Sequence, residues 1–187
     1  MNYPGKAKKQ FKKELISHAN RGMELEHIIN DANAYYLEKD IAVIYKKPTP
    51  INIVKIDYDK KRITDAFFKE ASTLDYNGIY KGLYIEFDAK ECNNKTSFTL
   101  RNVHDHQIKH IERILKHRGI CFLIISMNSR YFLFDGNILI DFINNNDRKS
   151  IPYSYIVDNS IEIKYNYLKG LDYIEALDKL LEVRYEK

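Results

Sequence analysis

The sequence lacks the features that a membrane or secreted protein needs. Its longest uninterrupted apolar run, Ile120 to Ile125, is far shorter than the roughly 20 residues of a membrane-spanning helix. No apolar stretch of the kind found in a secretory signal follows the N-terminal lysines. The cysteines, Cys92 and Cys121, form no Cys-x-x-Cys pair, and reduced thiols fit an intracellular chain. We therefore expect a cytoplasmic protein with no membrane partner.

Basic residues are concentrated near the N-terminus, although the net charge of the whole chain is only +4. In residues 1–21 the single acid is Glu14, and the basic residues are Lys6, Lys8, Lys9, Lys12, Lys13 and Arg21. We expect residues 1–20 to form a flexible basic arm and residues 21–187 to form a single folded domain. The arm and Arg21 can bind a polyanion such as DNA, and the alternative is a solvated tail.

Hydrophobic periodicity predicts alternating helices and strands in the rest of the chain. Apolar residues recur at three- and four-residue steps from Leu25 to Tyr36, which is typical of a helix. Further helices are predicted near 102–119, 138–143 and 174–181, and strands near 41–44, 83–91, 120–126, 131–134 and 152–165. This order predicts an α/β fold with helices on both faces of a sheet.

Two segments carry local signals of their own. Pro48 and Pro50 end the first strand, because neither can donate to a β-ladder. The region after them has too little apolar content to lie wholly in a core, so we expect a protruding stalk over about residues 48–70. The dipeptide Asn77-Gly78 predicts a tight turn before the next strand.

The predicted strand at 83–91 has two different faces. Alternation places one set of side chains toward a core and the other on the opposite face. The apolar set is Leu83, Ile85, Phe87 and Ala89, and the polar set is Tyr84, Glu86, Asp88 and Lys90.

Asp75, Asp88 and Lys90 together suit phosphodiester hydrolysis. A divalent cation can activate water and neutralise developing charge, and Mg²⁺ prefers hard oxygen ligands such as carboxylates. Lys90 follows Asp88 by two residues, so its ammonium group points to the same face and can contact phosphoryl oxygens. The spacing alone is a weak signal, because 30% of the residues are charged and a solvated strand face is the alternative. The hypothesis requires the three side chains to converge and to remain open to solvent.

Longer motifs extend this pattern along the chain. They are Gly22-Met23-Glu24-Leu25-Glu26, Lys46-Lys47-Pro48-Thr49-Pro50, Ser72-Thr73-Leu74-Asp75-Tyr76-Asn77-Gly78, Glu86-Phe87-Asp88-Ala89-Lys90-Glu91, Lys95-Thr96-Ser97-Phe98, His106-Gln107, Gly119-Ile120-Cys121-Phe122 and Ser150-Ile151-Pro152-Tyr153. In this order, and over nearly the whole chain after residue 20, the sequence resembles the RecU Holliday junction resolvases of low-GC Gram-positive bacteria and their relatives.

The resemblance implies a restriction-endonuclease-like fold, in which helices flank a mixed β-sheet and a stalk protrudes. It also implies a homodimer that makes paired Mg²⁺-dependent nicks in four-way DNA junctions, with Mn²⁺ as an alternative metal. The metal contacts would be Thr73, Asp75, Asp88 and Gln107, and Lys90 would stabilise the developing charge. A recombinase and a branch-migration motor are conceivable protein partners.

The acid pair departs from the family pattern. Where the family usually reads Asp-Phe-Glu-Ala-Lys, this chain reads Glu86-Phe87-Asp88-Ala89-Lys90. Because aspartate is shorter than glutamate, the metal would lie closer to the strand. Glu86, on the same face, could then partly substitute for Asp88.

Several other residues are candidates for the site. Glu26 would lie on the first helix near the metal's outer shell, and the alternative is a surface acid. His106 and His110 have a spacing that a zinc site could use, but no third ligand is evident. Cations can contact phosphates and aromatic rings can stack on unpaired bases, so the stalk supplies candidate DNA contacts. These are Lys55, Lys60, Lys61, Arg62, Phe67 and Phe68.

The favoured function is therefore a Mg²⁺-dependent endonuclease that resolves four-way junctions in homologous recombination and DNA repair. One alternative is a catalytically weakened protein that binds or anneals junction DNA without cutting it. Another is a sequence-specific, restriction-type nuclease, which would cleave unbranched duplex at a fixed sequence.

Overall fold

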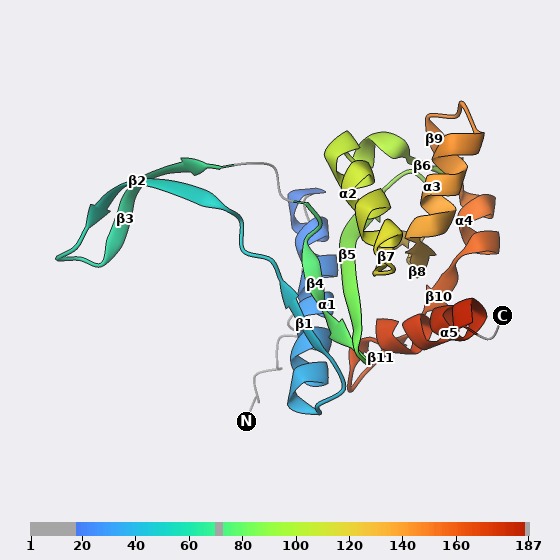
Figure 1. Ribbon diagram of the computed structural model, residues 1–187, viewed down its shortest axis with the longest axis horizontal. Helices are drawn as coiled ribbons and strands as arrows, with labels where there is room; N and C mark the ends of the chain where they lie inside the picture. Colours follow the sequence, from blue (N-terminus) through green and yellow to red (C-terminus); the bar gives the residue numbers. More distant parts are fainter. Residues whose placement is uncertain (1–17, 70–72, 186–187) are drawn as a thin grey trace, which may run out of the picture.

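A six-stranded mixed β-sheet organises the fold. The computed structural model describes residues 18–69 and 73–185 (Figure 1). In spatial order the strands of the sheet are β1 (Val43–Lys46), β4 (Tyr76–Tyr80), β5 (Leu83–Cys92), β7 (Ile120–Met127), β8 (Arg130–Asp135) and β10 (Ile161–Ile163). Strands β5 and β7 are parallel, and the other neighbours in this sheet are antiparallel. The mixed sheet predicted from the sequence is confirmed.

Helices cover both faces of the sheet. In the described part of the chain the α-helices are α1 (His18–Glu38), α2 (Asp105–Lys116), α3 (Gly136–Asn145), α4 (Tyr153–Asn159) and α5 (Tyr173–Tyr185). Helices α1 and α5 pack on one face, where Tyr36 and Leu177 join Phe122 in one apolar cluster. Helices α2, α3 and α4 pack on the other face, where Ile111 joins Leu123 in a second cluster. None of the helices in the described ranges is both long and apolar enough to cross a membrane.

The parallel pair of β5 and β7 lies at the centre of the sheet. Strand β7 is buried along nearly its whole length, so the run from Ile120 to Ile125 is apolar on both faces. A parallel connection needs a crossover, and the segment between the two strands supplies it through α2. The crossover places α2 over the polar face of β5, where Gln107 of the helix contacts Asp88 of the strand.

Strands β2 (Ile51–Asp57) and β3 (Arg62–Phe68) form a separate hairpin that projects away from the body (Figure 1). Every residue of β3 is exposed, and no residue of β2 is fully buried. An isolated two-stranded hairpin has little stability beyond its own ladder. The protruding element predicted from the sequence is confirmed, and residues 51–68 are called the stalk below.

Short elements complete the fold at the edges of the body. The remaining strands pair as β6 (Ser97–Thr99) with β9 (Ser150–Pro152) and as β11 (Tyr165–Asn166) with β12 (Gly170–Leu171). A 3₁₀ turn, Leu100–Asn102, precedes α2. The basic arm predicted for residues 1–20 falls almost entirely outside the described residues, as does the side chain of Arg21, so both stay predictions.

The turn predicted at Asn77-Gly78 is wrong. Both residues lie inside β4, paired with β1 on one side and with β5 on the other. A Cβ atom on Gly78 would lie only 2.1 Å from the carbonyl oxygen of Val43, so the glycine permits close approach of a neighbouring strand. The turn lies instead at Lys81-Gly82, where both residues have positive φ, as a tight β-hairpin requires.

The strand-like assignment of residues 152–165 is also wrong in its first half. Pro152 ends β9 and stands at the N-cap of helix α4, where a missing N–H costs nothing. Tyr153, Ile156 and Val157 then recur at helical steps and pack against the second apolar cluster.

Candidate active site

The pairing of β4 with β5 brings Asp75 and Asp88 together. Asp75 immediately precedes β4, and Asp88 lies within β5. The ladder pairs Tyr76 with Phe87, so continuing it by one residue places Asp75 opposite Asp88. Directly opposed residues in an antiparallel pair have Cβ atoms about 5 Å apart. Asp75 and Asp88, called the aspartate pair below, are therefore placed to share one cation.

Lys90 joins the aspartate pair from the same face of β5. Its Nζ atom lies 3.0 Å from Oδ2 of Asp88, and its side chain is 18% exposed. The side chain of Asp88 has no exposed surface, whereas Asp75 is half-buried. The expected convergence is present. The expectation that the side chains are open to solvent is wrong for Asp88, because α2 packs over this face of the strand, but Asp75 and Lys90 are half-buried, so solvent reaches the site from their side.

Burial dominates the electrostatics of Asp88. It raises the pKa of Asp88 from the usual 3.8 to about 7, while the Lys90 ammonium opposes this shift and the Asp75 carboxylate adds to it. Oδ1 of Asp88 is buried and accepts no hydrogen bond from the described residues. Leaving a buried carboxylate oxygen unsatisfied is costly. A hard cation next to this oxygen would relieve that cost.

Gln107 holds Asp88 in place from helix α2. Its Nε2 atom donates to Oδ2 of Asp88 and, over 3.0 Å, to the carbonyl oxygen of Thr73. Its Oε1 atom accepts from the backbone N–H of His104 over 3.2 Å, at the N-cap of the helix. This arrangement explains why a glutamine occurs on a buried helical face. It also presents the amide nitrogen to Asp88, so the metal contact expected of Gln107 stays a prediction.

Lys47 anchors the segment that carries Thr73 and Asp75. Its Nζ atom forms an ion pair with the buried Glu86 and donates to Oγ1 of Thr73 over 2.8 Å. Its backbone N–H donates to the carbonyl oxygen of Asp75 over 2.7 Å. Sequence reasoning missed this role, although a lysine placed directly before the proline that ends a strand was a visible signal.

The remaining partners of Glu86 are Thr73, whose Oγ1 donates to Oε1 over 3.3 Å, and the side chains of Tyr84 and His110. The Tyr84 hydroxyl donates to Oε2 over 2.6 Å, and Nε2 of His110 lies 2.8 Å from Oε1. Although burial acts to raise it, the hydrogen bonds from Lys47 and Tyr84 lower the pKa of Glu86. Both carboxylate oxygens are engaged, so Glu86 is not available to substitute for Asp88, contrary to the expectation from the sequence.

Glu26 and His106 lie apart from this convergence. The carboxylate of Glu26 forms an ion pair with Lys46, and none of its described contacts is with the aspartate pair. The catalytic role of Glu26 stays a prediction. The ring of His106 stacks on that of His104 with centroids 5.5 Å apart, whereas His110 contacts Glu86. The two histidines of the suspected zinc spacing therefore have different partners.

The donor set at the aspartate pair fits Mg²⁺ better than zinc. Within the described ranges, no group of three or more His, Cys, Asp or Glu side chains is arranged to hold a metal ion. Mg²⁺ does not need such a group, because it keeps several waters and uses one or two carboxylates together with substrate phosphates. The unsatisfied Oδ1 of Asp88, with Asp75 opposite, supplies that type of site.

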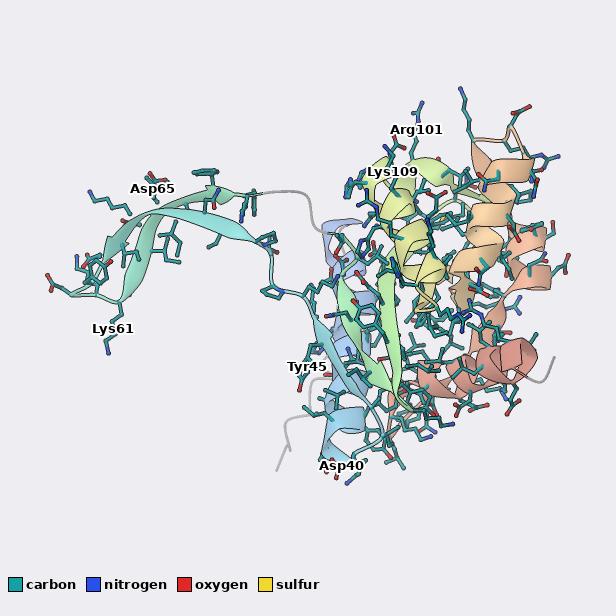
Figure 2. All side chains as sticks on the ribbon, in the orientation of Figure 1. Asp40, Tyr45, Lys61, Asp65, Arg101 and Lys109 are labelled. Carbon is teal, nitrogen blue, oxygen red and sulfur yellow. The ribbon has the colours of Figure 1, made fainter. Side chains whose placement is uncertain are left out.

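The stalk presents its predicted DNA contacts to solvent. Figure 2 shows Lys61 near the tip, remote from the body. Phe67 is 57% and Phe68 77% exposed, and as neighbours on one strand they point to opposite faces of the hairpin. The rest of the predicted set, Lys55, Lys60 and Arg62, is exposed as well. Exposed apolar surface of this extent is typical of an interaction site.

Comparison with known proteins gives extensive matches. The family model described as Recombination protein U matches residues 20–179. The Holliday junction resolvase RecU of Oceanobacillus iheyensis is 46% identical, over 96% of this chain and 99% of that protein. The RecU proteins of Lactiplantibacillus plantarum and Geobacillus kaustophilus are 48% and 44% identical, over 96% and 97% of this chain and 91% and 95% of theirs.

One solved structure that matches is Hjc, a Holliday junction resolvase of Archaeoglobus fulgidus. Its TM-score is 0.43 at 9% identity, over 76% of this chain and 91% of that chain. The family model and the relatives, in contrast, cover nearly the whole sequence. The chain therefore belongs to the RecU family.

Proposed function

We propose that this protein is a structure-selective endonuclease that cuts four-way DNA junctions by metal-dependent phosphodiester hydrolysis. The observation that carries this proposal is the convergence of Asp75, Asp88 and Lys90 at the point where the chain returns from the stalk. The family relatives named above are Holliday junction resolvases, which supports the same substrate. The activity would serve homologous recombination and DNA repair in the cytoplasm.

The metal that we propose is Mg²⁺, with Mn²⁺ as an alternative. The aspartate pair would hold it, with Thr73 and Gln107 beside them. When bound, such an ion supplies water activation and charge neutralisation at the phosphate. Gln107 keeps Asp88 oriented through its amide nitrogen. The ammonium group of Lys90 forms an ion pair with Asp88. It can also contact the phosphoryl oxygens and stabilise the charge that develops there.

We also propose that the active form is a homodimer. A four-way junction has two-fold symmetry, so a symmetric dimer can present one active site to each of two opposing strands. Contacts to phosphates would position the DNA, and readout of base sequence would be weak. The stalk, with its exposed aromatic rings, would contact unpaired bases at the junction centre.

A junction-cleavage assay tests this proposal. The full chain is incubated with a labelled synthetic junction and with a linear duplex of the same sequence, in Mg²⁺, Mn²⁺ or excess EDTA. We expect paired, symmetric nicks in the junction only when metal is present. Binding without nicks in either metal would favour the catalytically weakened binder. Equal cutting of the linear duplex at a fixed sequence would favour a restriction-type nuclease.

A further inference from the structure

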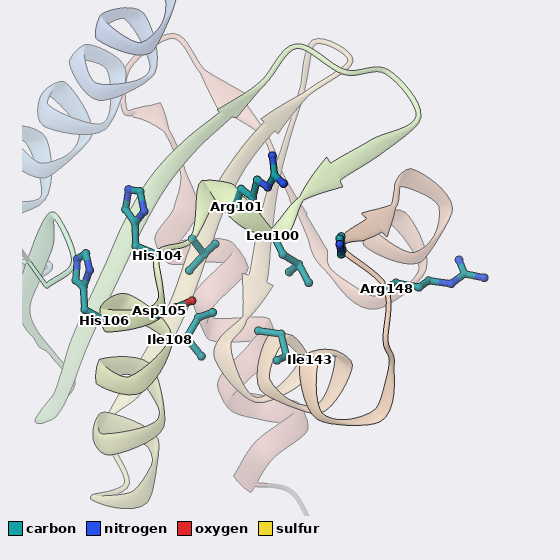
Figure 3. Close-up of a pocket in the computed structure, with 10 residues that line it drawn as sticks. Leu100, Arg101, His104, Asp105, His106, Ile108, Ile143 and Arg148 are labelled. Carbon is teal, nitrogen blue, oxygen red and sulfur yellow. The ribbon is translucent and has the colours of Figure 1, made fainter.

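An open groove lies between α2 and α3, and Figure 1 shows these helices on the side of β5 away from the stalk. It has a volume of about 770 Å³, between the start of α2 and the segment that follows α3. Figure 3 shows that Leu100, Ile108 and Ile143 point into it, whereas Arg101 and Arg148 extend outward from its rim. This space, with Lys149 also on its lining, is called the α2–α3 groove below.

The rim of the α2–α3 groove carries unpaired positive charge. Arg101, Arg148 and Lys149 are exposed, and none of them forms an ion pair or side-chain hydrogen bond with any described residue. Asp105, in the first turn of α2, is the one carboxylate among the described residues that line the groove. Three cations with a single opposing acid make the groove attractive to a polyanion.

The groove is connected directly to the aspartate pair. His104 lines the groove, and its backbone N–H donates to Gln107, whose amide nitrogen donates to Asp88. The first turn of α2 therefore borders the groove, and Gln107 of the same helix contacts the aspartate pair. A strand with its phosphate at Asp88 that continues past the start of α2 would enter the groove.

We propose that the α2–α3 groove binds the sugar–phosphate backbone of the duplex arm that flanks the cut. The phosphates contact Arg101, Arg148 and Lys149, and the deoxyribose rings pack on the apolar floor. This assignment rests on the proposed function. In Figure 1, strands β4 and β5, which position the aspartate pair, lie between the stalk and helices α2 and α3. The stalk and the groove together would therefore hold the DNA across the site of cutting.

The test compares two triple variants of the full chain that remove the same charges at different places. One variant is Arg101→Gln/Arg148→Gln/Lys149→Gln in the groove. The matched control is Arg113→Gln/Lys116→Gln/Arg118→Gln, which are exposed residues at the other end of α2. Binding to a labelled junction is measured in EDTA over a series of salt concentrations, first with long arms and then with arms of only a few base pairs.

We expect the groove variant to lose affinity for the long-armed junction by about 10- to 100-fold. The slope of log K against log salt should fall by about two to three units, because each lost phosphate contact removes about one. The deficit should shrink on the short-armed junction, and the control should bind like wild type. Wild-type affinity and slope in the groove variant, or the same deficit in both variants, would overturn the proposal.

The two proposals fail in different ways. Because binding is measured without metal, it reports on the groove whether or not the protein cuts. If the wild-type protein nicks junctions and the groove variant binds them normally, only the groove assignment is refuted. If the wild-type protein never nicks junctions and the groove variant binds them weakly, the endonuclease proposal is refuted and the groove assignment stands.

Discussion

Asp75 lies opposite Asp88 across β4 and β5, one residue beyond the ladder pair Tyr76–Phe87. Directly opposed like charges destabilise a sheet, and burial of Asp88 increases the cost. Lys90, 3.0 Å from Asp88, offsets part of this repulsion. The folded chain therefore contains a carboxylate pair whose charge is compensated only in part, and a divalent cation would complete the compensation.

Metal should stabilise the protein more at high pH than at low pH. The folded-state pKa of Asp88 is raised to about 7, so between its unfolded value and 7 the folded chain holds a proton that the unfolded chain releases. The contribution of Asp88 to the free energy of unfolding is therefore fully present below about pH 4 and is lost as the pH rises toward 7. Mg²⁺ needs the ionised carboxylate. We expect the same Mg²⁺ concentration to raise Tm clearly at about pH 8 and little at about pH 5.5. Equal increments at both values would contradict this account.

Asp88→Asn should make the metal-free protein more stable at about pH 8, because it removes a buried charge that Asp75 repels. Each kcal/mol of relief should raise Tm by about 2–4 °C in a chain of this size. The variant should also lose the response to Mg²⁺. Thermal unfolding with and without metal measures both effects. A Tm below that of wild type would show that the Lys90 ion pair outweighs the cost of burying Asp88.

Lys47→Ala should destabilise the fold by about 3 kcal/mol, since it leaves the buried carboxylate of Glu86 without its cation. Lys46→Ala is the matched control. It breaks a pair with Glu26 in which both side chains are about 40% exposed, so the expected loss is below about 1 kcal/mol. Denaturant unfolding compares the two, and equal losses would refute the anchoring role. Adding Glu86→Gln to Lys47→Ala should recover part of the stability.

Phe68→Ala should weaken junction binding without changing stability. The Phe68 ring is 77% exposed on the stalk, so its removal creates no cavity. Stacking on an unpaired base is worth about 1–3 kcal/mol, which corresponds to a loss of affinity of about 5- to 150-fold. Titration of the protein into a labelled junction and into a labelled linear duplex measures this loss of affinity. A similar loss on both substrates would show that the ring does not contact the junction centre.

Much of the architecture could be predicted from local pattern. Three patterns predict directly which side chains are buried. They are the apolar stripe of α1, the alternation along β5 and the continuous apolar run of β7. The prediction of a turn at Asn77-Gly78 was wrong, because the sequence does not distinguish a glycine needed for close strand approach from one needed for a turn. Helix α4 was not predicted, because the β-branched and aromatic residues near Pro152 favoured strands more strongly than their helical spacing favoured a helix.

The convergence of Asp75, Asp88 and Lys90 could be predicted from the sequence, but the burial of Asp88 could not. Strand alternation and the Asp75–Asp88 spacing placed the carboxylates on one face. The burial of Asp88 depends on how α2 packs across β5, which no local pattern encodes. The links from Lys47 to Thr73 and from His110 to Glu86 join residues distant in sequence, so they could be recognised only in the folded chain.

The most direct test of the central claim is single-turnover cleavage of a junction in Mg²⁺ by wild type, Asp75→Asn and Asp88→Asn, with binding measured in parallel. We expect paired nicks by wild type and a rate at least about 100-fold lower for both variants, while the affinity for the junction stays near that of wild type. Cutting by Asp88→Asn at the wild-type rate, or cutting by wild type in excess EDTA, would contradict this claim.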